Sequence, residues 1–179
     1  TVFYNGPKCG ASAPDHLHFQ ASLTGTIPVE EAALEKSRRL NRKQVRGVEI
    51  LTIEDFGREV IVLESRQIES LEHVLLDLLE ALSAAAGTKE EPMMNLLCSF
   101  GDSAWRVILF PRSKHRPDAY FKEGEDRILI SPAAVDIGGL IITPLEKDFN
   151  AVDARTVEGI FHEVSLPQAT VEAAVEKLS

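Results

Sequence analysis

The chain has 179 residues, and its 19 Lys and Arg stand against 28 Asp and Glu, a formal net charge of -9 with neutral histidines. Hydrophobic residues make up 44% and charged residues 26%, a globular balance that argues against disorder, collagen-like repeats and coiled coils. The length predicts a single domain over residues 1–179 with a packed core. The acidity argues against broad binding to nucleic acid or membrane surfaces, because both are polyanionic.

Cysteine usage and the chain start give further expectations. Cys9 and Cys98 lie far apart and form no C-x-x-C pair, so neither a disulfide framework nor a zinc ribbon is indicated, and one bridge between them stays open. No stretch reaches ~18 consecutive apolar residues and no signal peptide opens the chain, so we expect a cytoplasmic protein without membrane contact. Thr1 leads directly into an apolar run. We therefore expect the C-terminal part of a longer protein.

The first third of the chain predicts short strands around polar segments. The segment from Thr24 to Arg46 is polar, and we expect it to be irregular, with a short helix near Glu30 to Arg39. Asp55-Phe56-Gly57 predicts a turn between two strands. The strands expected here are Val2 to Tyr4, His16 to Leu23, Val48 to Ile53 and Val60 to Leu63.

A long amphipathic helix is the clearest element of the remainder. From Gln67 to Ala86, apolar residues recur at steps of three and four, and Gly87 follows as a stop signal. The other expected elements are strands at Met94 to Cys98, Ala104 to Phe110, Arg127 to Ile130 and Leu140 to Ile142, then helices at Ala154 to Val164 and Gln168 to Leu178. This order predicts the α+β class, with a sheet covered by helices on one side.

Two cationic stretches without acidic residues interrupt the acidic background. We expect the first to be a surface loop, or a contact with a preceding segment or a partner. The second follows the strand ending in Phe110-Pro111, which favours either an exposed loop or cations that reach a phosphate from a strand end. The two stretches are Lys36, Arg38, Arg39, Arg42, Lys43 and Arg46, and Arg112, Lys114 and Arg116, with His115 inside the second.

Polar groups that suit phosphoryl chemistry are concentrated between Asn5 and Gln20. On an extended strand, His16, His18 and Gln20 would share one face, because alternate side chains do. The preceding Gly10-Ala11-Ser12 is a run of small residues whose backbone N–H groups can approach an anion closely. A nucleophile beside such a donor nest predicts phosphoryl-group transfer. The competing interpretation is a metal site with two histidine ligands, and the absence of Asp and Glu from positions 19–29 weakens it.

The run His16-Leu17-His18-Phe19-Gln20 resembles the H-x-H-x-Q motif of the histidine-triad superfamily. The similar branch holds galactose-1-phosphate uridylyltransferase, diadenosine tetraphosphate phosphorylase and GDP-hexose phosphorylase. The likeness extends over most of the chain. It continues through Asn95-Leu96-Leu97, Trp105, Phe110-Pro111-Arg112-Ser113, the run from Ser131 to Gly139, and Glu163-Val164-Ser165-Leu166.

The resemblance implies a HIT-like α+β catalytic domain, with a mainly antiparallel sheet and helices packed on it. Such a domain transfers a nucleotidyl group through a covalent histidine intermediate. By motif position His18 is the nucleophile, Gln20 hydrogen-bonds the phosphate oxygens and His16 holds the neighbouring groups. Asn5 and Ser12 match loop residues that contact phosphates, beside the backbone of Gly10 and Ala11. Arg112, Lys114 and His115 complete the phosphate- and nucleotide-binding residues that we expect.

The same resemblance implies the partners. The donor would be a nucleoside-diphosphate sugar or dinucleoside polyphosphate, and the acceptor phosphate or a sugar phosphate. No cofactor is required for the chemistry, and a structural zinc would belong only to an absent N-terminal segment, which also carries the base-binding groups. The activity of this chain without that segment stays open, as does the choice between monomer and homodimer. The alternatives are a nucleotide hydrolase of the same superfamily and a metal- or nucleotide-binding module without turnover.

Overall fold

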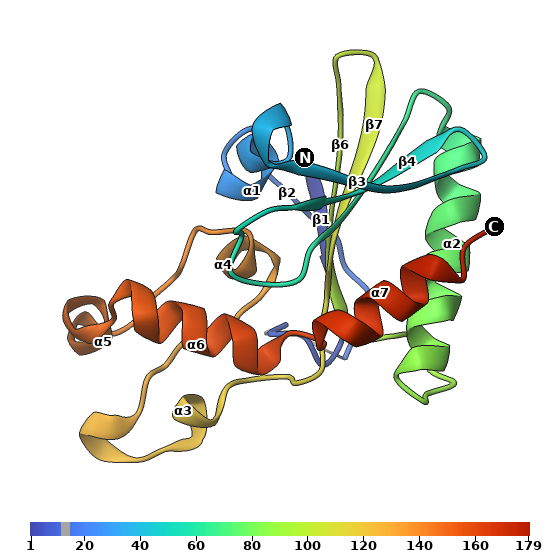
Figure 1. Ribbon diagram of the computed structural model, residues 1–179. Helices are drawn as coiled ribbons and strands as arrows, with labels where there is room; N and C mark the ends of the chain where they lie inside the picture. Colours follow the sequence, from blue (N-terminus) through green and yellow to red (C-terminus); the bar gives the residue numbers. More distant parts are fainter. Residues whose placement is uncertain (12–14) are drawn as a thin grey trace.

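Seven strands form one sheet in the computed structural model, which describes residues 1–11 and 15–179 (Figure 1). All neighbouring strands pair antiparallel, in the order β2-β1-β6-β7-β5-β4-β3. This arrangement confirms the α+β class and the mainly antiparallel sheet. The strands are β1 (Val2–Asn5), β2 (Gln20–Ala21), β3 (Arg39–Val45), β4 (Val48–Ile53), β5 (Ile61–Ser65), β6 (Met94–Gly101) and β7 (Ala104–Pro111).

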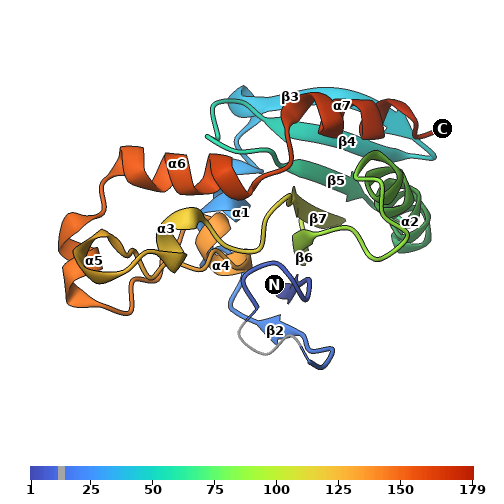
Figure 2. The same ribbon diagram turned by 90° about the horizontal axis from the view of Figure 1, so that it is seen from below.

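Helices cover both faces of the sheet, in place of the single covered face that the sequence suggested (Figure 2). The α-helices are α1 (Pro28–Ala32), α2 (Ile68–Ala85), α3 (Asp118–Phe121), α4 (Ala134–Ile137), α5 (Glu146–Ala151), α6 (Ala154–Val164) and α7 (Gln168–Glu176). Short 3-10 turns lie at Lys36–Arg38 and Gly124–Asp126. The expected helices at the centre and C-terminus of the chain are confirmed as α2, α6 and α7.

Successive side chains of the central strands point to opposite faces of the sheet, and each face has its own hydrophobic core. On β5, Ile61 and Leu63 face α2 and α7, whereas Val62 faces the opposite core with α1, α4 and α6. All three side chains are at most 1% exposed. A strand buried on both faces must be apolar at every position, so the run Val60-Ile61-Val62-Leu63 has no polar alternation.

Four of the expected segments differ in the structure. The strand expected from His16 to Leu23 shrinks to β2, because only Gln20 and Ala21 pair with β1. The segment expected to be irregular before Arg46 contains strand β3 instead, which pairs along β4. Arg127 to Ile130 and Leu140 to Ile142 are not strands. In these two segments, side-chain carboxylates accept hydrogen bonds from backbone N–H groups: Leu129 N–H donates to Asp148 (2.8 Å), and Ile142 N–H donates to Asp136 (2.9 Å).

Half of the cations of the first stretch lie on β3, at one end of the strand order, and the others flank it. Arg39 pairs with Glu64 of β5 at 3.3 Å, and Arg42 donates to the Thr52 hydroxyl at 2.9 Å. Charged side chains on a terminal strand oppose edge-to-edge pairing with another molecule. We therefore attribute this stretch to the sheet edge and not to an anion site.

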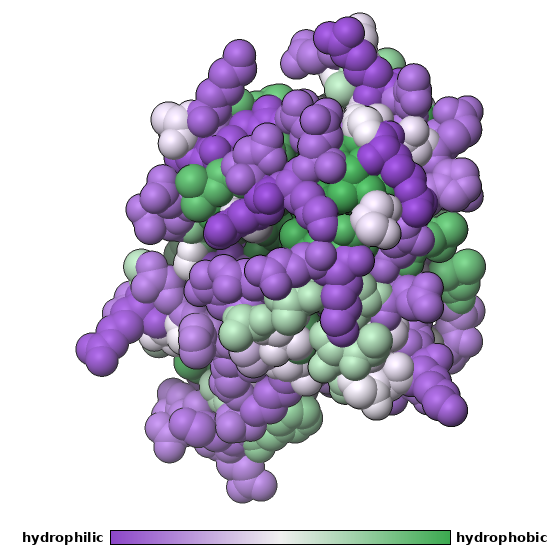
Figure 3. All heavy atoms as spheres, turned by 45° about the vertical axis from the view of Figure 1, so that its right-hand side comes forward, coloured by the Kyte–Doolittle hydropathy of each residue, from purple (hydrophilic) through white to green (hydrophobic). Residues whose placement is uncertain are grey.

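The surface of the molecule is mixed in hydropathy. On the face shown in Figure 3, hydrophilic side chains predominate and hydrophobic groups form smaller areas between them. None of the helices in the described part of the chain combines the length and apolar character needed to cross a bilayer.

Candidate functional site

A pocket of about 310 Å³ lies where β1, β2 and the following loop meet the segment from Leu129 to Pro144. It brings together five of the side chains and backbone positions expected from the sequence, although they span 16 positions of the chain. These are Asn5, Gly10, Ala11, His18 and Gln20, and they face Ser131, Ala133 and Asp136 across the pocket.

His18 is half-buried in this pocket, and its ring is oriented by the backbone. Its Nδ1 lies 3.2 Å from the carbonyl oxygen of His16. A carbonyl oxygen only accepts, so in the neutral ring Nδ1 carries the proton and Nε2 keeps the lone pair. The arrangement leaves the lone pair of Nε2 available to an atom in the pocket.

His16 takes a different position from the one an unbroken strand would give. Its side chain is 62% exposed, and its Nδ1 lies 3.1 Å from Asp15 Oδ1. Its ring remains next to that of His18, with 5.1 Å between the centroids. His16 therefore contacts the pocket histidine through its ring and its carbonyl, outside the pocket lining.

The loop before the motif depends on glycine at position 10. Gly10 has φ +78°, and a Cβ there would lie 2.1 Å from the carbonyl oxygen of Pro132. Its N–H donates to His115 Nδ1 at 3.2 Å. Burial, with Arg116 nearby, lowers the pKa of His115, which favours the neutral ring that this contact requires. Ser12, expected to contact phosphate, lies outside the described residues.

Arg112 lies beneath the pocket loops rather than in the pocket, and it is 2% exposed. Its Nε donates to Val164 O (3.2 Å), while Nη2 donates to the carbonyl oxygens of Lys114 (3.1 Å) and His115 (3.2 Å). Nη1 donates to Pro132 O (2.8 Å) and to Asn95 Oδ1. All five guanidinium donors thus face protein oxygens. Lys114 pairs with Asp118 and Glu163, away from the pocket lining.

Two residues of the site were not expected from the sequence: Asn95, which is buried behind the pocket, and Asp136, which lines it. Asn95 is fully buried, and its Nδ2 donates to Asn5 Oδ1 (2.7 Å) and to Cys9 O (2.8 Å). Asp136 is 5% exposed and accepts from the N–H groups of Ala133 and Ile142, and burial raises its pKa. An amide between Met94 and Leu96, in the apolar first half of β6, is a sequence signal for Asn95.

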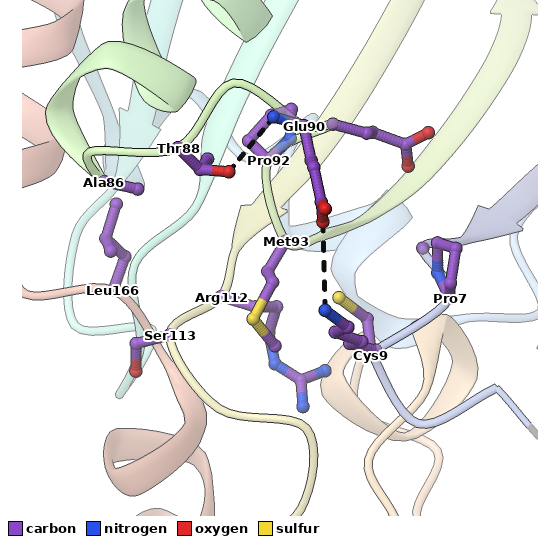
Figure 4. Close-up of a pocket in the computed structure, with 13 residues that line it drawn as sticks. Pro7, Cys9, Ala86, Thr88, Glu90, Pro92, Met93, Arg112, Ser113 and Leu166 are labelled. Carbon is purple, nitrogen blue, oxygen red and sulfur yellow. Dashed lines mark hydrogen bonds and ion pairs between the residues drawn. The ribbon is translucent and has the colours of Figure 1, made fainter.

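A second cavity of about 380 Å³ lies on the other side of the loop from Gly6 to Cys9, and Figure 4 shows Cys9, Met93 and Arg112 along it. Lys8 and Glu90 pair across 3.8 Å at its rim. Cys9 and Cys98 are free thiols, so the bridge left open above does not form. Burial raises the pKa of Cys9 to about 11, which keeps it protonated at neutral pH.

No group of three His, Cys, Asp or Glu side chains is placed to hold a metal ion within residues 1–11 and 15–179. The nearby His16 and His18 have no third ligand of this type among those residues.

Two family models match the chain in succession. Residues 1–23, which include the H-x-H-x-Q run, match a domain of unknown function, DUF4922. Residues 28–178 match the family described as GDPGP1-like, C-terminal domain. No curated protein and no solved structure matches the chain. The second model spans most of the sequence, and the chain therefore belongs to the GDPGP1-like C-terminal domain family, in agreement with the GDP-hexose phosphorylase branch that its sequence resembles.

Proposed function

We propose that this chain carries the nucleophile of a GDP-hexose phosphorylase-type nucleotidyltransferase. The observation that carries the proposal is the convergence of His18, Gln20 and Asn5 in one pocket of a chain from this family. These are the side chains to which the H-x-H-x-Q resemblance assigns nucleophile and phosphate contacts.

The reaction follows from the chemistry of a neutral imidazole in two displacements. In the first, the lone pair of His18 Nε2 forms a bond to the α-phosphorus of the GDP-hexose, and the bond from that phosphorus to the bridging oxygen breaks. Hexose 1-phosphate leaves with the electron pair. In the second, a phosphate oxygen attacks the same phosphorus, the phosphorus–nitrogen bond breaks, and GDP is formed. Imidazole suits both steps because it is a good nucleophile and a good leaving group.

Neighbouring groups support the charged transition state. The His16 carbonyl 3.2 Å from His18 Nδ1 favours the ring as charge develops on it during attack. Gln20 lines the same pocket and would donate to a non-bridging phosphate oxygen. One such donor aimed at developing charge contributes ~3 kcal/mol to transition-state stabilisation.

The test incubates the protein with GDP-hexose and phosphate and measures GDP and hexose 1-phosphate. UDP-hexose and dinucleoside polyphosphates serve as competing donors. We expect His18→Ala to lower the rate by ~10³-fold or more, because it removes the nucleophile. His73→Ala is the matched control: this histidine lies exposed on α2, remote from the pocket lining, and its loss should leave the rate unchanged.

Omitting phosphate separates the transferase from the hydrolase alternative. Without an acceptor, a phosphorylase should stop at the covalent stage, seen by intact-mass measurement as one added guanylyl group in the wild type and none in His18→Ala. Continued GMP release without phosphate identifies water as the acceptor. Absence of product from every donor, or full activity in His18→Ala, overturns the proposal.

A further inference from the structure

Four polar side chains form a continuous hydrogen-bond relay from the interior to the pocket: Arg112, Asn95, Asn5 and Gln20. We propose that Arg112 and Asn95 are positioning residues, which act through Asn5 to determine which end of the Gln20 amide faces the substrate. The inference rests on the proposed function of the pocket and extends it to two buried residues outside the lining of that pocket.

The relay begins at a group that can only donate. Arg112 places Nη1 against Asn95 Oδ1, and a guanidinium has no acceptor. Burial lowers the pKa of Arg112 to about 10, so the group remains charged at neutral pH. Its other donors are held by four backbone carbonyls, so it cannot rotate without leaving buried groups unpaired.

The orientation of Asn95 follows from that contact. Its oxygen faces Arg112, so its Nδ2 must face the opposite way, where it donates to Asn5 Oδ1 (2.7 Å) and Cys9 O (2.8 Å). The side chain is fully buried. A flipped amide would set its NH₂ against the guanidinium and its oxygen against two acceptors, which is unfavourable at every contact.

The orientation of the Asn5 amide follows from that of Asn95. Its Oδ1 accepts from Asn95 and also from the Ala134 N–H at 2.7 Å, at the start of α4. Both donors require oxygen at this position, so Nδ2 is the atom that faces Gln20 Oε1, at 3.4 Å. This last contact is the longest of the relay, and Gln20 is exposed, so Gln20 is the member that a change in Asn5 can reorient.

The consequence concerns a substrate phosphate. With Oε1 turned to Asn5, Gln20 presents its Nε2 donors to the pocket that it shares with His18. Phosphate oxygens accept hydrogen bonds, so this orientation attracts them. The reversed amide would place Oε1 against a phosphate oxygen, which repels it. Two buried residues thereby determine whether the exposed amide stabilises or opposes the transition state.

Asn95→Asp tests the relay, because the aspartate keeps the shape but cannot donate to Asn5. Asn5 Oδ1 would then face the introduced carboxylate, and we expect this repulsion to outweigh the one remaining contact from the Ala134 N–H, so that Asn5 reverses its amide and Gln20 reverses in turn. We expect kcat/KM to fall ~10²-fold, the same loss that we expect for Gln20→Ala, which removes the donor outright. In the double variant that combines Asn95→Asp with Gln20→Ala, the second change should cause no further loss of kcat/KM, to within about a factor of two. Losses that multiply would mean that Asn95 acts independently of Gln20, and would overturn the inference.

A second readout needs no substrate and therefore stands even if the proposed activity fails. In side-chain ¹⁵N–¹H NMR, solvent exchange of the Gln20 NH₂ should be fast in the wild type and slower in Asn95→Asp, where that group donates to Asn5. Asn150→Asp makes the same chemical change at an exposed position of α5 and should alter neither exchange nor kcat/KM. Unchanged Gln20 exchange in Asn95→Asp overturns the inference in an inactive protein as well as an active one.

Asn5→Asp provides the test if the buried Asn95→Asp does not fold. It keeps an oxygen for Asn95 and Ala134 and removes only the donor that faces Gln20. The same reversal of Gln20 is expected, with the same ~10²-fold loss and no further loss in combination with Gln20→Ala. A direct phosphate contact from Asn5 would instead give losses that multiply, and would overturn the relay.

Discussion

Gly10 illustrates how a single residue controls the pocket loop. Its φ of +78° is left-handed backbone, and its α-carbon faces the backbone of Pro132 and Ala133. Other glycines with positive φ, such as Gly47 in the β3–β4 turn, have open space where a Cβ would be. Comparing substitutions at Gly10 and Gly47 therefore separates two free-energy costs, that of the left-handed backbone and that of close packing.

We predict that Gly10→Ala destabilises the protein more than Gly47→Ala. Both substitutions carry the left-handed penalty of roughly 1–2 kcal/mol, but the Gly10 variant must also move the Pro132 backbone away from a 2.1 Å contact. Thermal denaturation of the two variants measures the difference. Equal losses of stability would show that the loop adapts freely and that the contact with Pro132 is unimportant.

His115 gives the same loop a dependence on pH. Its Nδ1 accepts from the Gly10 N–H, and burial lowers its pKa from the usual value near 6.5. A lowered folded-state pKa means that the unfolded chain binds more protons as pH falls through about 6.5. This contribution to stability is therefore present above that pH and declines below it.

We predict that His115→Asn reduces the loss of stability between about pH 7.5 and 5.5, because asparagine offers an acceptor without titrating in this range. Urea unfolding at several pH values measures the effect. His162→Asn, at an exposed position of α6, should retain the acid sensitivity of the wild type. Identical pH profiles for the wild type and His115→Asn would contradict the prediction.

Among the elements, Arg58 joins three segments around one core. Its guanidinium lies 4.0 Å from the ring centroid of Phe56 and 4.4 Å from that of Phe161 on α6. Its Nε donates to Ile137 O at the end of α4, at 2.6 Å. A planar cation between two rings thus connects the β4–β5 loop, α4 and α6.

We expect Arg58→Lys to lower the free energy of unfolding by roughly 1–2 kcal/mol, because lysine keeps the charge but loses the planar stacking. Urea denaturation measures the loss. Arg155→Lys is the control, since Arg155 is exposed on α6, the helix that carries Phe161. Equal stabilities of the two variants would show that charge alone accounts for the role of Arg58.

At the scale of the whole molecule, the sequence predicted the parts of the fold that depend on local periodicity. The apolar recurrence of α2 and the continuous apolar run of β5 predict a helix and a strand because burial acts on neighbouring residues. The short extent of β2 within the expected strand, and the presence of β3, were not predicted, because their pairing depends on partners elsewhere in the chain. Likewise, the segments that contain Leu129 and Ile142 have strand-like sequences. In the structure the backbone N–H groups of these two residues donate to the carboxylates of Asp148 and Asp136.

The candidate site likewise has a part that local sequence predicts and a part that it does not. His18 and Gln20 could be named from a local motif, and the structure brings both to one pocket. The opposite wall and the contacts beneath it connect residues 105 positions apart, from Gly10 to His115, and 129 apart, from Asn5 to Ala134. No local pattern encodes such distances, so the buried position of Arg112 required the folded structure.

The division of the chain between two family models has a consequence for protein engineering. Asn5 and Gln20 lie within residues 1–23, whereas Asn95 and Arg112 lie within residues 28–178. A crossover placed between residues 23 and 28 would separate the two halves of one hydrogen-bonded array. Chimeras built at that junction from homologous chains should work only when both parents place compatible donors and acceptors across it.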